Sequence, residues 1–466
     1  MKMAYPFALC ALALGAHCAA ADGTAAERLA GAIRFPTISA EGKTDASAEA
    51  LAGLHAYLAE SFPLVHRRLT RETVNRFGLI YTWTGSDPSL KPILLMAHQD
   101  VVPIASGTEA KWRHAPFSGD IADGFIWGRG AWDDKGSLLA LLEALEGLIA
   151  SGAQPKRTII LVSGQDEESG GERGAKAIAE LLDKRGIHPE FVLDEGGVVT
   201  DGIIAGATRP VAFIGVAEKG MATFSLTAEG APGHSSMPPP QTVVGRVAAA
   251  VAKLEARPMP ARIDGLARRT FEGLSASMAG LQHWALANLW LTEPLVRRKL
   301  ESQPSTNAML RTTTAVTVIA GGNKANVLPG KAEALVNFRI KPGERIADVA
   351  AHIRETIDDS GITVAQQPDG EEPSPVSPDD APGYRWIAQT IHDTAPDAAV
   401  VPGLVVGATD SRSMTRLTDR VYRFMPIRVH PEDVARFHGT DERISVADYE
   451  EMIAFYKRLI TLSAVD

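Results

Sequence analysis

Residues 93–100, ILLMAHQD, combine a short apolar run with a histidine and a carboxylate that follow it directly. The run 93–96 has the length and the aliphatic content of a buried strand. A second run, 159–162, is followed in the same way by Glu167 and Glu168. Acidic and imidazole side chains just past buried parallel strands lie where open α/β sheets bind their ligands. The pattern therefore predicts an α/β fold with a polar site at one edge of its sheet.

A third acidic segment, GRGAWDDKG at residues 128–136, carries Asp133 and Asp134. Asp133 stands 35 residues after His98 and 35 residues before Glu168. Burying several carboxylates together is unfavourable unless a cation compensates their charge. Each acidic pair alone is more typical of a solvated helix start. Together, and with the motifs described below, the three segments indicate a cation site.

Length, charge and the first residues restrict the class of protein. The 466 residues suffice for two domains, and the formal charge of −9 argues against nucleic acid as a partner. Lys2, the apolar stretch 4–15 and the alanines 19–21 form the pattern of a secretory signal peptide, residues 1–21. The stretch is too short to span a membrane, which takes about 20 apolar residues. Both cysteines lie in this segment, so we expect a secreted protein without disulfides, located in a bacterial periplasm.

The order of the expected elements divides the rest of the chain. Strand and helix patterns alternate from about residue 25 to 215, which predicts a mostly parallel sheet flanked by helices. After Gly220 the order is β-α-β-β-α-β, from a strand at 221–229 to one at 362–366, as in a ferredoxin-like α+β domain. The expected units are a signal peptide (1–21), a catalytic domain (22–216 and 369–466) and an inserted lid domain (217–368) with a helical insertion near 261–310.

The insertion at 261–310 is rich in leucine and also contains Trp284 and Trp290. Such residues could form a helical core of their own, a groove for an acyl chain, or a surface for dimerisation. A core is the general expectation for apolar side chains at helical spacing. The lid domain is also where we expect a homodimer to form, if the protein forms one.

Eight motifs follow one another from residue 98 to residue 444, and each alone is weak evidence. In this order they resemble the di-zinc hydrolase family of aminoacylase, the Gly-X carboxypeptidase, glutamate carboxypeptidase and carnosinase. Within that family the chain is most similar to the branch of the Gly-X carboxypeptidase and the secreted N-acyl-amino-acid hydrolases. The motifs are HQDVVP, WRHAPFSG, GRGAWDDKG, DEESGG, LDEGG, GAPGHSSMP, GGNKANVLP and RFHGTDERI.

The resemblance implies two metal ions that share one carboxylate. His98 would bind the first ion, and Asp133 would bridge the two, which suits cations about 3.5–4 Å apart. Either Asp194 or Glu195 would complete the first site. Neighbouring side chains diverge, so we expect only one of them to be a ligand, and we slightly favour Glu195. Ligands of oxygen and imidazole without thiolate indicate zinc, with cobalt or manganese as substitutes. The second ion would be bound by Asp133, Glu168 and His438.

The same resemblance assigns the proton transfers. Glu167 matches the catalytic base, which takes a proton from the attacking water and passes it to the departing amine. Asp100 matches the acid that orients the ring of His98. The peptide bond between Asp133 and Asp134 is cis in related structures.

Four further residues match groups that contact the substrate. His234 in GAPGHSSMP matches a histidine that reaches over the metals to stabilise the oxyanion, with Asn326 as its companion. In some relatives this histidine comes from a partner subunit, and the sequence leaves open which arrangement applies here. Arg339 in VNFRIKP and Arg412 in GATDSR are competing candidates for binding a substrate carboxylate.

These roles imply a secreted di-zinc metallohydrolase that cleaves the amide bond to a C-terminal amino acid, as a carboxypeptidase or dipeptidase does. The alternative is an N-acyl-amino-acid amidohydrolase of the aminoacylase type, which differs in what the acyl pocket accepts. A third hypothesis is a peptide-binding protein without activity. The retention of Glu167 and of every candidate ligand argues against it.

Overall fold

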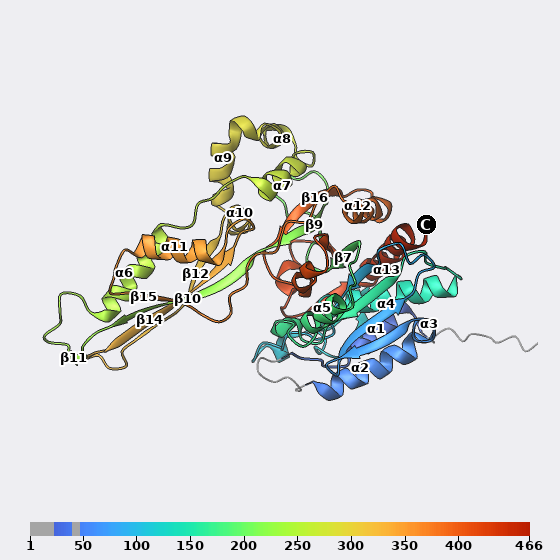
Figure 1. Ribbon diagram of the computed structural model, residues 1–466, viewed down its shortest axis with the longest axis horizontal. Helices are drawn as coiled ribbons and strands as arrows, with labels where there is room; N and C mark the ends of the chain where they lie inside the picture. The colour runs from blue at the N-terminus through green and yellow to red at the C-terminus, as the bar shows by residue number, and fades with distance from the viewer. Residues whose placement is uncertain (1–22, 40–46) are drawn as a thin grey trace, which may run out of the picture.

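The computed structural model describes residues 23–39 and 47–466, so the expected signal peptide lies outside the described residues. One large sheet forms the body of the molecule (Figure 1). Its central strand β3 (Ile93–Met96) pairs in parallel with β6 (Ile159–Ser163) and β7 (Phe191–Asp194), as the sequence predicts. The order is β1 (Thr70–Val74), β2 (Gly78–Trp83), β6, β3, β7, β17 (Val421–Arg423), β9 (Val211–Glu218), β8 (Val199–Thr200) and β18 (Arg428–Val429), with β16 (Ala399–Val405) beside β9.

Helices cover both faces of this sheet. Because successive side chains of a strand point to opposite faces, Leu95 and Leu161 enter one core while Leu94 and Ile160 enter the other. The first core lies under α1 (Ala25–Ile33), α4 (Lys135–Ala150), α12 (Pro382–Thr394) and α13 (Val446–Ile460), and the second lies under α5 (Ala175–Lys184). This is the predicted mostly parallel sheet flanked by helices.

Helix α4 fixes one of the acidic segments. The leucines that predict it are buried on nearly all sides, between the sheet and α13. Its first residue, Lys135, follows directly on Asp133 and Asp134, whose peptide bond is cis. The Lys135 ammonium is fully buried and donates hydrogen bonds to the carbonyls of Ala32 and Phe35. The start of α4 is therefore held rigidly at the edge of the sheet.

A second, smaller sheet projects from the body (Figure 1). Its four antiparallel strands have the order β12 (Thr313–Gly321), β14 (Lys331–Ile340), β10 (Gly220–Glu229) and β15 (Thr363–Gln366). Helices α6 (Val243–Ala256) and α11 (Ile346–Ile357) pack on one face and form a separate core with it. This confirms the ferredoxin-like motif. Only Lys219 separates β10 from β9 of the large sheet.

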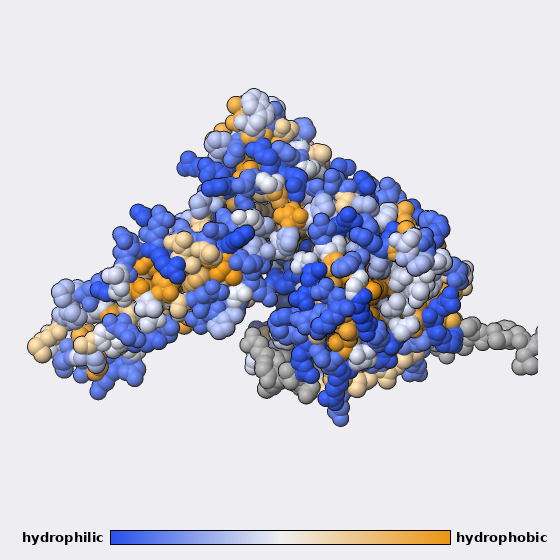
Figure 2. Space-filling view, viewed as in Figure 1, coloured by the Kyte–Doolittle hydropathy of each residue, from blue (hydrophilic) through white to orange (hydrophobic). Residues whose placement is uncertain are grey.

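The insertion forms four helices that pack against the body. Phe271 and Leu274 are buried together with Val211 of β9 and Val401 of β16. Part of the insertion is thus a core, as expected, but Trp284 and Trp290 are 49% and 76% exposed. Figure 2 shows apolar side chains on the surface of this lobe, above the body. The helices are α7 (Gly265–Ser275), α8 (Gly280–Ala287), α9 (Leu289–Glu301) and α10 (Pro304–Leu310).

Among the described residues, none of the helices combines the length and the apolar character that crossing a membrane requires.

Candidate active site

Asp133 lies between two pairs of potential metal ligands. On one side, His98 Nε2 is 2.9 Å from Asp133 Oδ1 and 3.5 Å from Glu195 Oε1. On the other side, His438 Nε2 is 2.7 Å from Asp133 Oδ2 and 3.4 Å from Glu168 Oε1. Each oxygen of Asp133 therefore faces its own pair of side chains. This is the arrangement that a carboxylate needs in order to bridge two cations.

The donor set fits divalent metal ions. Donor atoms of His98, Asp133 and Glu168, and separately of His98, Asp134 and Glu195, lie within 4.8 Å of one another. Glu168 Oε1 and Asp134 Oδ1 are buried without a hydrogen-bond partner, which is costly for a carboxylate. A cation would satisfy them. Imidazole and carboxylate donors without thiolate are the ligands that zinc, cobalt and manganese accept.

The pKa shifts within the cluster also indicate a cation site. The carboxylates of Asp133 and Glu168 raise the pKa of His438 to about 10. Burial raises the pKa of Glu195 well above its ordinary value, and the nearby Asp133 adds to this. A group of buried carboxylates that raises the pKa values of its neighbours in this way attracts positive charge.

The structure separates Asp194 from Glu195. The carboxylate of Asp194 accepts a hydrogen bond of 2.8 Å from the backbone N–H of Ser411. Glu195 faces His98 instead. Neighbouring side chains at the end of a strand diverge, so only one of the two acids can face His98, and here it is Glu195, the acid that we slightly favoured from the sequence. Asp194, the alternative ligand, lies outside the ligand cluster.

Asp100 supports two parts of the site at once. Its carboxylate accepts the backbone N–H groups of Glu167 and Glu168, each at 3.1 Å. The same carboxylate lies 3.4 Å from Nδ1 of His98. Nδ1 of His98 lies closer, at 3.0 Å, to the backbone carbonyl of Asp100, so this carbonyl orients the ring together with the carboxylate. Asp100 also holds the turn that carries the two glutamates. Burial raises the pKa of Glu167 well above its ordinary value, a shift that the charge of Glu195 reinforces and that of His98 opposes.

A buried ion pair that the sequence analysis missed joins two ligand loops. Glu442 Oε1 accepts backbone N–H groups from Gly130, Trp132 and Asp133 at 2.8–3.2 Å. Arg129 pairs with Glu442 and donates to the carbonyl of His438 at 3.1 Å. The loops of Asp133 and His438 are therefore held together. The only signal in the sequence is that both charged residues stand inside the motifs GRGAWDDKG and RFHGTDERI.

A cavity of about 650 Å³ opens beside the ligands. Its charged lining contains Glu167, Asp133 and the two pairs of potential ligands apart from His98, and the ring of Phe437 stacks on His438 with centroids 4.4 Å apart. The cavity also has an apolar wall. That wall is made of Phe213, Met309, Leu404, Val405 and Val406.

The two candidate carboxylate binders differ in position. Arg339, on β14 of the lid domain, lines the cavity. Arg412 pairs instead with Glu218, 3.5 Å away, and with Glu371, and donates to the carbonyl of Lys219. Arg412 thus binds both segments that connect the lid domain with the body, and it is not among the cavity residues. The structure places Arg339 at the site and Arg412 at this connection.

His234 and Asn326 lie together, but away from the metal ligands of the same chain. His234 belongs to the short strand β11 (Gly233–His234), which pairs with β13 (Val327–Leu328). The backbone N–H of Ser235 donates to the carbonyl of Asn326 at 3.2 Å. Figure 1 places β11 at the end of the lid domain that is farthest from the body. Neither residue lines the cavity, so the expectation that they lie over the metals is not met within one chain.

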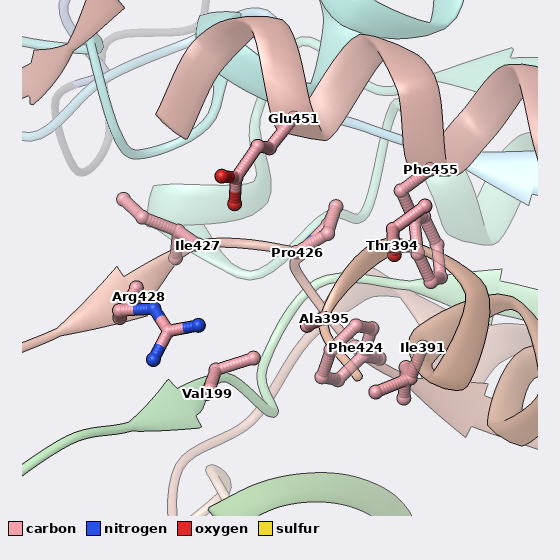
Figure 3. Close-up of a pocket in the computed structure, with 10 residues that line it drawn as sticks. All are labelled: Val199, Ile391, Thr394, Ala395, Phe424, Pro426, Ile427, Arg428, Glu451 and Phe455. Carbon is pink, nitrogen blue, oxygen red and sulfur yellow. The ribbon is translucent and has the colours of Figure 1, made fainter. Parts of the chain in front are cut away.

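A second cavity lies near α12 and α13 and is lined by Phe424, Phe455 and the charged groups of Arg428 and Glu451 (Figure 3). Its volume is about 20 Å³, which is room for about one water molecule. It is too small for a substrate.

Comparison with known proteins agrees with this geometry. Residues 94–462 match the model of peptidase family M20/M25/M40. The chain is 41% identical over 444 residues to the N-fatty-acyl-amino acid synthase/hydrolase PM20D1 of Xenopus tropicalis, which covers 94% of this chain and 86% of the relative. It is 38% identical to the probable carboxypeptidase S-like 2 of Dictyostelium discoideum, over 93% of this chain and 84% of the relative.

Solved structures share the fold at low sequence identity. The M20 family metallo-carboxypeptidase Sso-CP2 from Sulfolobus solfataricus superposes with a TM-score of 0.68 at 18% identity, covering 94% of this chain and 99% of that one. Human carnosine dipeptidase 1 gives a TM-score of 0.62 at 15% identity, covering 93% and 94%.

Proposed function

Because the chain belongs to peptidase family M20/M25/M40, and is therefore a metal-dependent hydrolase, we propose that it uses two zinc ions to release a C-terminal amino acid from an apolar acyl group. The observation that carries this proposal is the cavity, which joins the Asp133 cluster to an apolar wall. A fatty or other apolar acyl group fits such a wall. The carboxypeptidase alternative differs only in that the acyl group is part of a peptide.

Asp133 would bridge the two ions, His98 and Glu195 would hold one, and Glu168 and His438 the other. When bound, such ions polarise the scissile carbonyl and lower the pKa of a water molecule at the site. Zinc is the proposed metal, and cobalt or manganese would satisfy the same donors.

Glu167 is the proposed proton carrier. Its side chain borders the cavity, and its backbone is fixed by Asp100. The carboxylate would accept the proton of the attacking water and then donate it to the amide nitrogen as the bond to the amino acid breaks. Burial, which raises the pKa of Glu167, makes the carboxylate a stronger base for the first of these steps.

Arg339 is the proposed binder of the substrate carboxylate. It reaches the cavity from the lid domain, while the ligands belong to the body. A guanidinium can hold a carboxylate with two parallel hydrogen bonds, which would orient the substrate with its acyl group toward the apolar wall. Such a contact would also draw the lid domain and the body together around the substrate.

We expect the zinc-loaded protein to release free amino acid from long-chain N-acyl amino acids faster than from unblocked dipeptides. The ammonium group of a dipeptide would have to lie against the apolar wall, where a charge is poorly solvated. Amino acid release, measured by chromatography for both substrate classes at equal concentration, checks this. Faster release from dipeptides would favour the carboxypeptidase alternative, and no release from either class would contradict the proposed function.

The proposed contact between Arg339 and the substrate carboxylate can be tested by substitution. Arg339→Met should raise KM for an N-acyl amino acid by about 10-fold or more, and it should have little effect on the slow cleavage of the matching carboxamide. Arg412→Met is the control. It should not affect the N-acyl amino acid more than the matching carboxamide, because Arg412 binds Glu218 and Glu371.

We further propose that the protein acts as a homodimer in which His234 of one copy serves the site of the other. The support is that His234 and Asn326 lie together at the far end of the lid domain, while the family motif assigns them to the site. A second copy that presents this end to the cavity would complete the oxyanion-binding groups.

Mixing two inactive variants tests this arrangement. If His234→Ala and Glu167→Gln chains exchange freely, half of the dimers are mixed and one of their two sites is intact, so activity should return to about a quarter of the native value. Each variant alone is the control. If the mixture stays inactive although mixed dimers form, His234 acts within its own chain or not at all.

Export to a bacterial periplasm is proposed from the first residues alone. The support is the sequence pattern of Lys2, the apolar stretch 4–15 and the alanines 19–21.

A further inference from the structure

Helix α9 of the insertion has apolar side chains on two opposite faces, and only one of these faces belongs to a core. Leu289, Val296 and Leu300 pack into the core that the insertion shares with β9 and β16. Leu291 and Leu295 lie together on the opposite face, because side chains four positions apart share one face of a helix. They are 56% and 77% exposed. The sequence therefore builds an apolar face on α9 that the core does not use.

Three further apolar side chains are exposed on these two helices. Trp290, at the start of α9, is 76% exposed, and Leu281 and Trp284 of the adjoining helix α8 are 78% and 49% exposed. Figure 1 places α8 and α9 together where the insertion projects beyond both the body and the lid domain. We call the five side chains, Leu281, Trp284, Trp290, Leu291 and Leu295, the apolar tip. Exposed apolar side chains that gather in this way mark an interaction surface.

Basic side chains border the apolar tip at the end of α9. The two glutamates of this helix, Glu293 and Glu301, are paired with arginines at 3.2–3.5 Å. Arg298 and Lys299 are exposed, and within the described part of the chain neither has an acidic partner. Arg298 lies on the same face of the helix as Leu295, one turn further along. The apolar tip thus has a positive border that is available to an anionic partner.

We propose that the apolar tip binds the surface of a lipid bilayer that contains anionic lipids. Trp and Leu side chains enter the boundary between headgroups and acyl chains, and basic side chains beside them contact the headgroup phosphates. Helix α9 offers both kinds of group on one exposed face, with the cations directly after the leucines. A helix of this kind lies on the bilayer surface and does not cross it.

A second copy of the chain fits the apolar tip less well. A stable protein interface buries about 800 Å² on each side against a complementary face, whereas the apolar tip is the projecting end of a small lobe (Figure 2). In a symmetric contact between two copies, the same surface of each copy faces the other. Arg298 and Lys299 would then lie near like charges, and the glutamates of α9 are already paired. The charges therefore favour an anionic lipid surface.

Lipid binding at the apolar tip would bring the cavity to the place where the proposed substrates gather. Helix α10 packs on α9 and carries Met309, which lines the cavity. A long-chain N-acyl amino acid is an anionic amphiphile, and its acyl chain partitions into lipid. This consequence rests on the proposed function, whereas lipid binding itself does not.

The test measures how the zinc-loaded protein without residues 1–21 co-sediments with vesicles of phosphatidylcholine, alone or mixed with phosphatidylglycerol. Binding to the mixed vesicles should be about 10-fold tighter, because each basic side chain is attracted to the anionic surface, and added salt should reduce the difference. Trp290→Ser combined with Leu295→Ser should weaken binding to the mixed vesicles by about 10-fold or more. Arg298→Gln combined with Lys299→Gln should lower it to the level of the neutral vesicles.

Ile121→Ser is the matched control, because Ile121 is a 45% exposed apolar side chain of β4 (Asp120–Ala122) in the body. It should bind vesicles like the native protein. All of the substitutions affect exposed side chains, so melting temperatures should stay close to the native value.

The inference is overturned if the native protein does not bind the mixed vesicles, or if the variant with both serines binds them as tightly as the native protein. A native dimer that binds no vesicles and that these two serines convert to a monomer, in analytical ultracentrifugation, would instead assign the apolar tip to a contact between copies. Vesicle binding needs no turnover, so the inference can fail while N-acyl amino acids are hydrolysed, and it can hold while they are not.

Discussion

Replacing Glu167 by Gln should leave two metal ions bound and lower kcat by about 10²–10⁴-fold. The side chain keeps its shape, and no ligand is removed, since His98, Asp133, Glu168, Glu195 and His438 are all retained. The amide cannot take up or return a proton, and it loses the function that we assign to the carboxylate. Steady-state kinetics and metal analysis of the same preparation measure the two effects together.

The matched control is Glu172→Gln, the same substitution five residues along the chain. Glu172 is exposed and pairs with Lys176 on the surface. It should behave like the native protein in both measurements. Near-native activity in Glu167→Gln would show that another group carries the proton, and loss of metal in that variant would show that Glu167 is a ligand.

Asp133→Asn should abolish the binding of both ions, not of one. The two oxygens of Asp133 face separate ligand pairs, so both sites lose a negative ligand at once, and the repulsion between the ions is no longer compensated. We expect metal content to fall from about two ions to fewer than one per chain, and turnover to fall below detection.

Unfolding of the variant would also remove the bound metal, so the stability of the variant has to be measured as well. In the metal-free protein, the burial of Asp133 is outweighed by its hydrogen bonds with His438 and His98, which hold the pKa of this carboxyl well below its ordinary value, so Asp133→Asn should lower the melting temperature of the metal-free variant. Circular dichroism at the assay temperature should nevertheless show a folded chain. Asp419→Asn, on the exposed surface, is the control for the substitution itself. Retention of one tightly bound ion in Asp133→Asn would contradict a bridging role.

The sequence predicted most of the fold because its hydrophobic periods are clear. The strand expected over residues 93–96 coincides with β3, and the strand expected over 221–229 coincides with β10 within one residue. A fully buried strand appears in the sequence as a continuous apolar run, and a helix with one buried face appears as apolar residues spaced three or four positions apart. The ends of these strands indicated a cation site, whereas the assignment of Asp133 and His438 as ligands came from the family resemblance. Only the structure distinguishes Glu195, which faces His98, from Asp194.

Other features depend on contacts that no local pattern encodes. Arg129 and Glu442 are 313 positions apart, and only the fold brings them together. Arg412 was a plausible carboxylate binder until its partners Glu218 and Glu371 were known. Trp290 fits the apolar stripe of a packed helix, yet it lies on the outer side of the insertion. The role that we propose for His234 depends on a second copy, which a single sequence does not describe.

The central claim is that this chain is an amide hydrolase that requires two metal ions bridged by Asp133. The most direct test adds zinc stepwise to the chelated protein while measuring both bound metal and amino acid release from an N-acyl amino acid. Release should reach its maximum only when about two ions are bound per chain. Full activity with one ion or with none would contradict the claim.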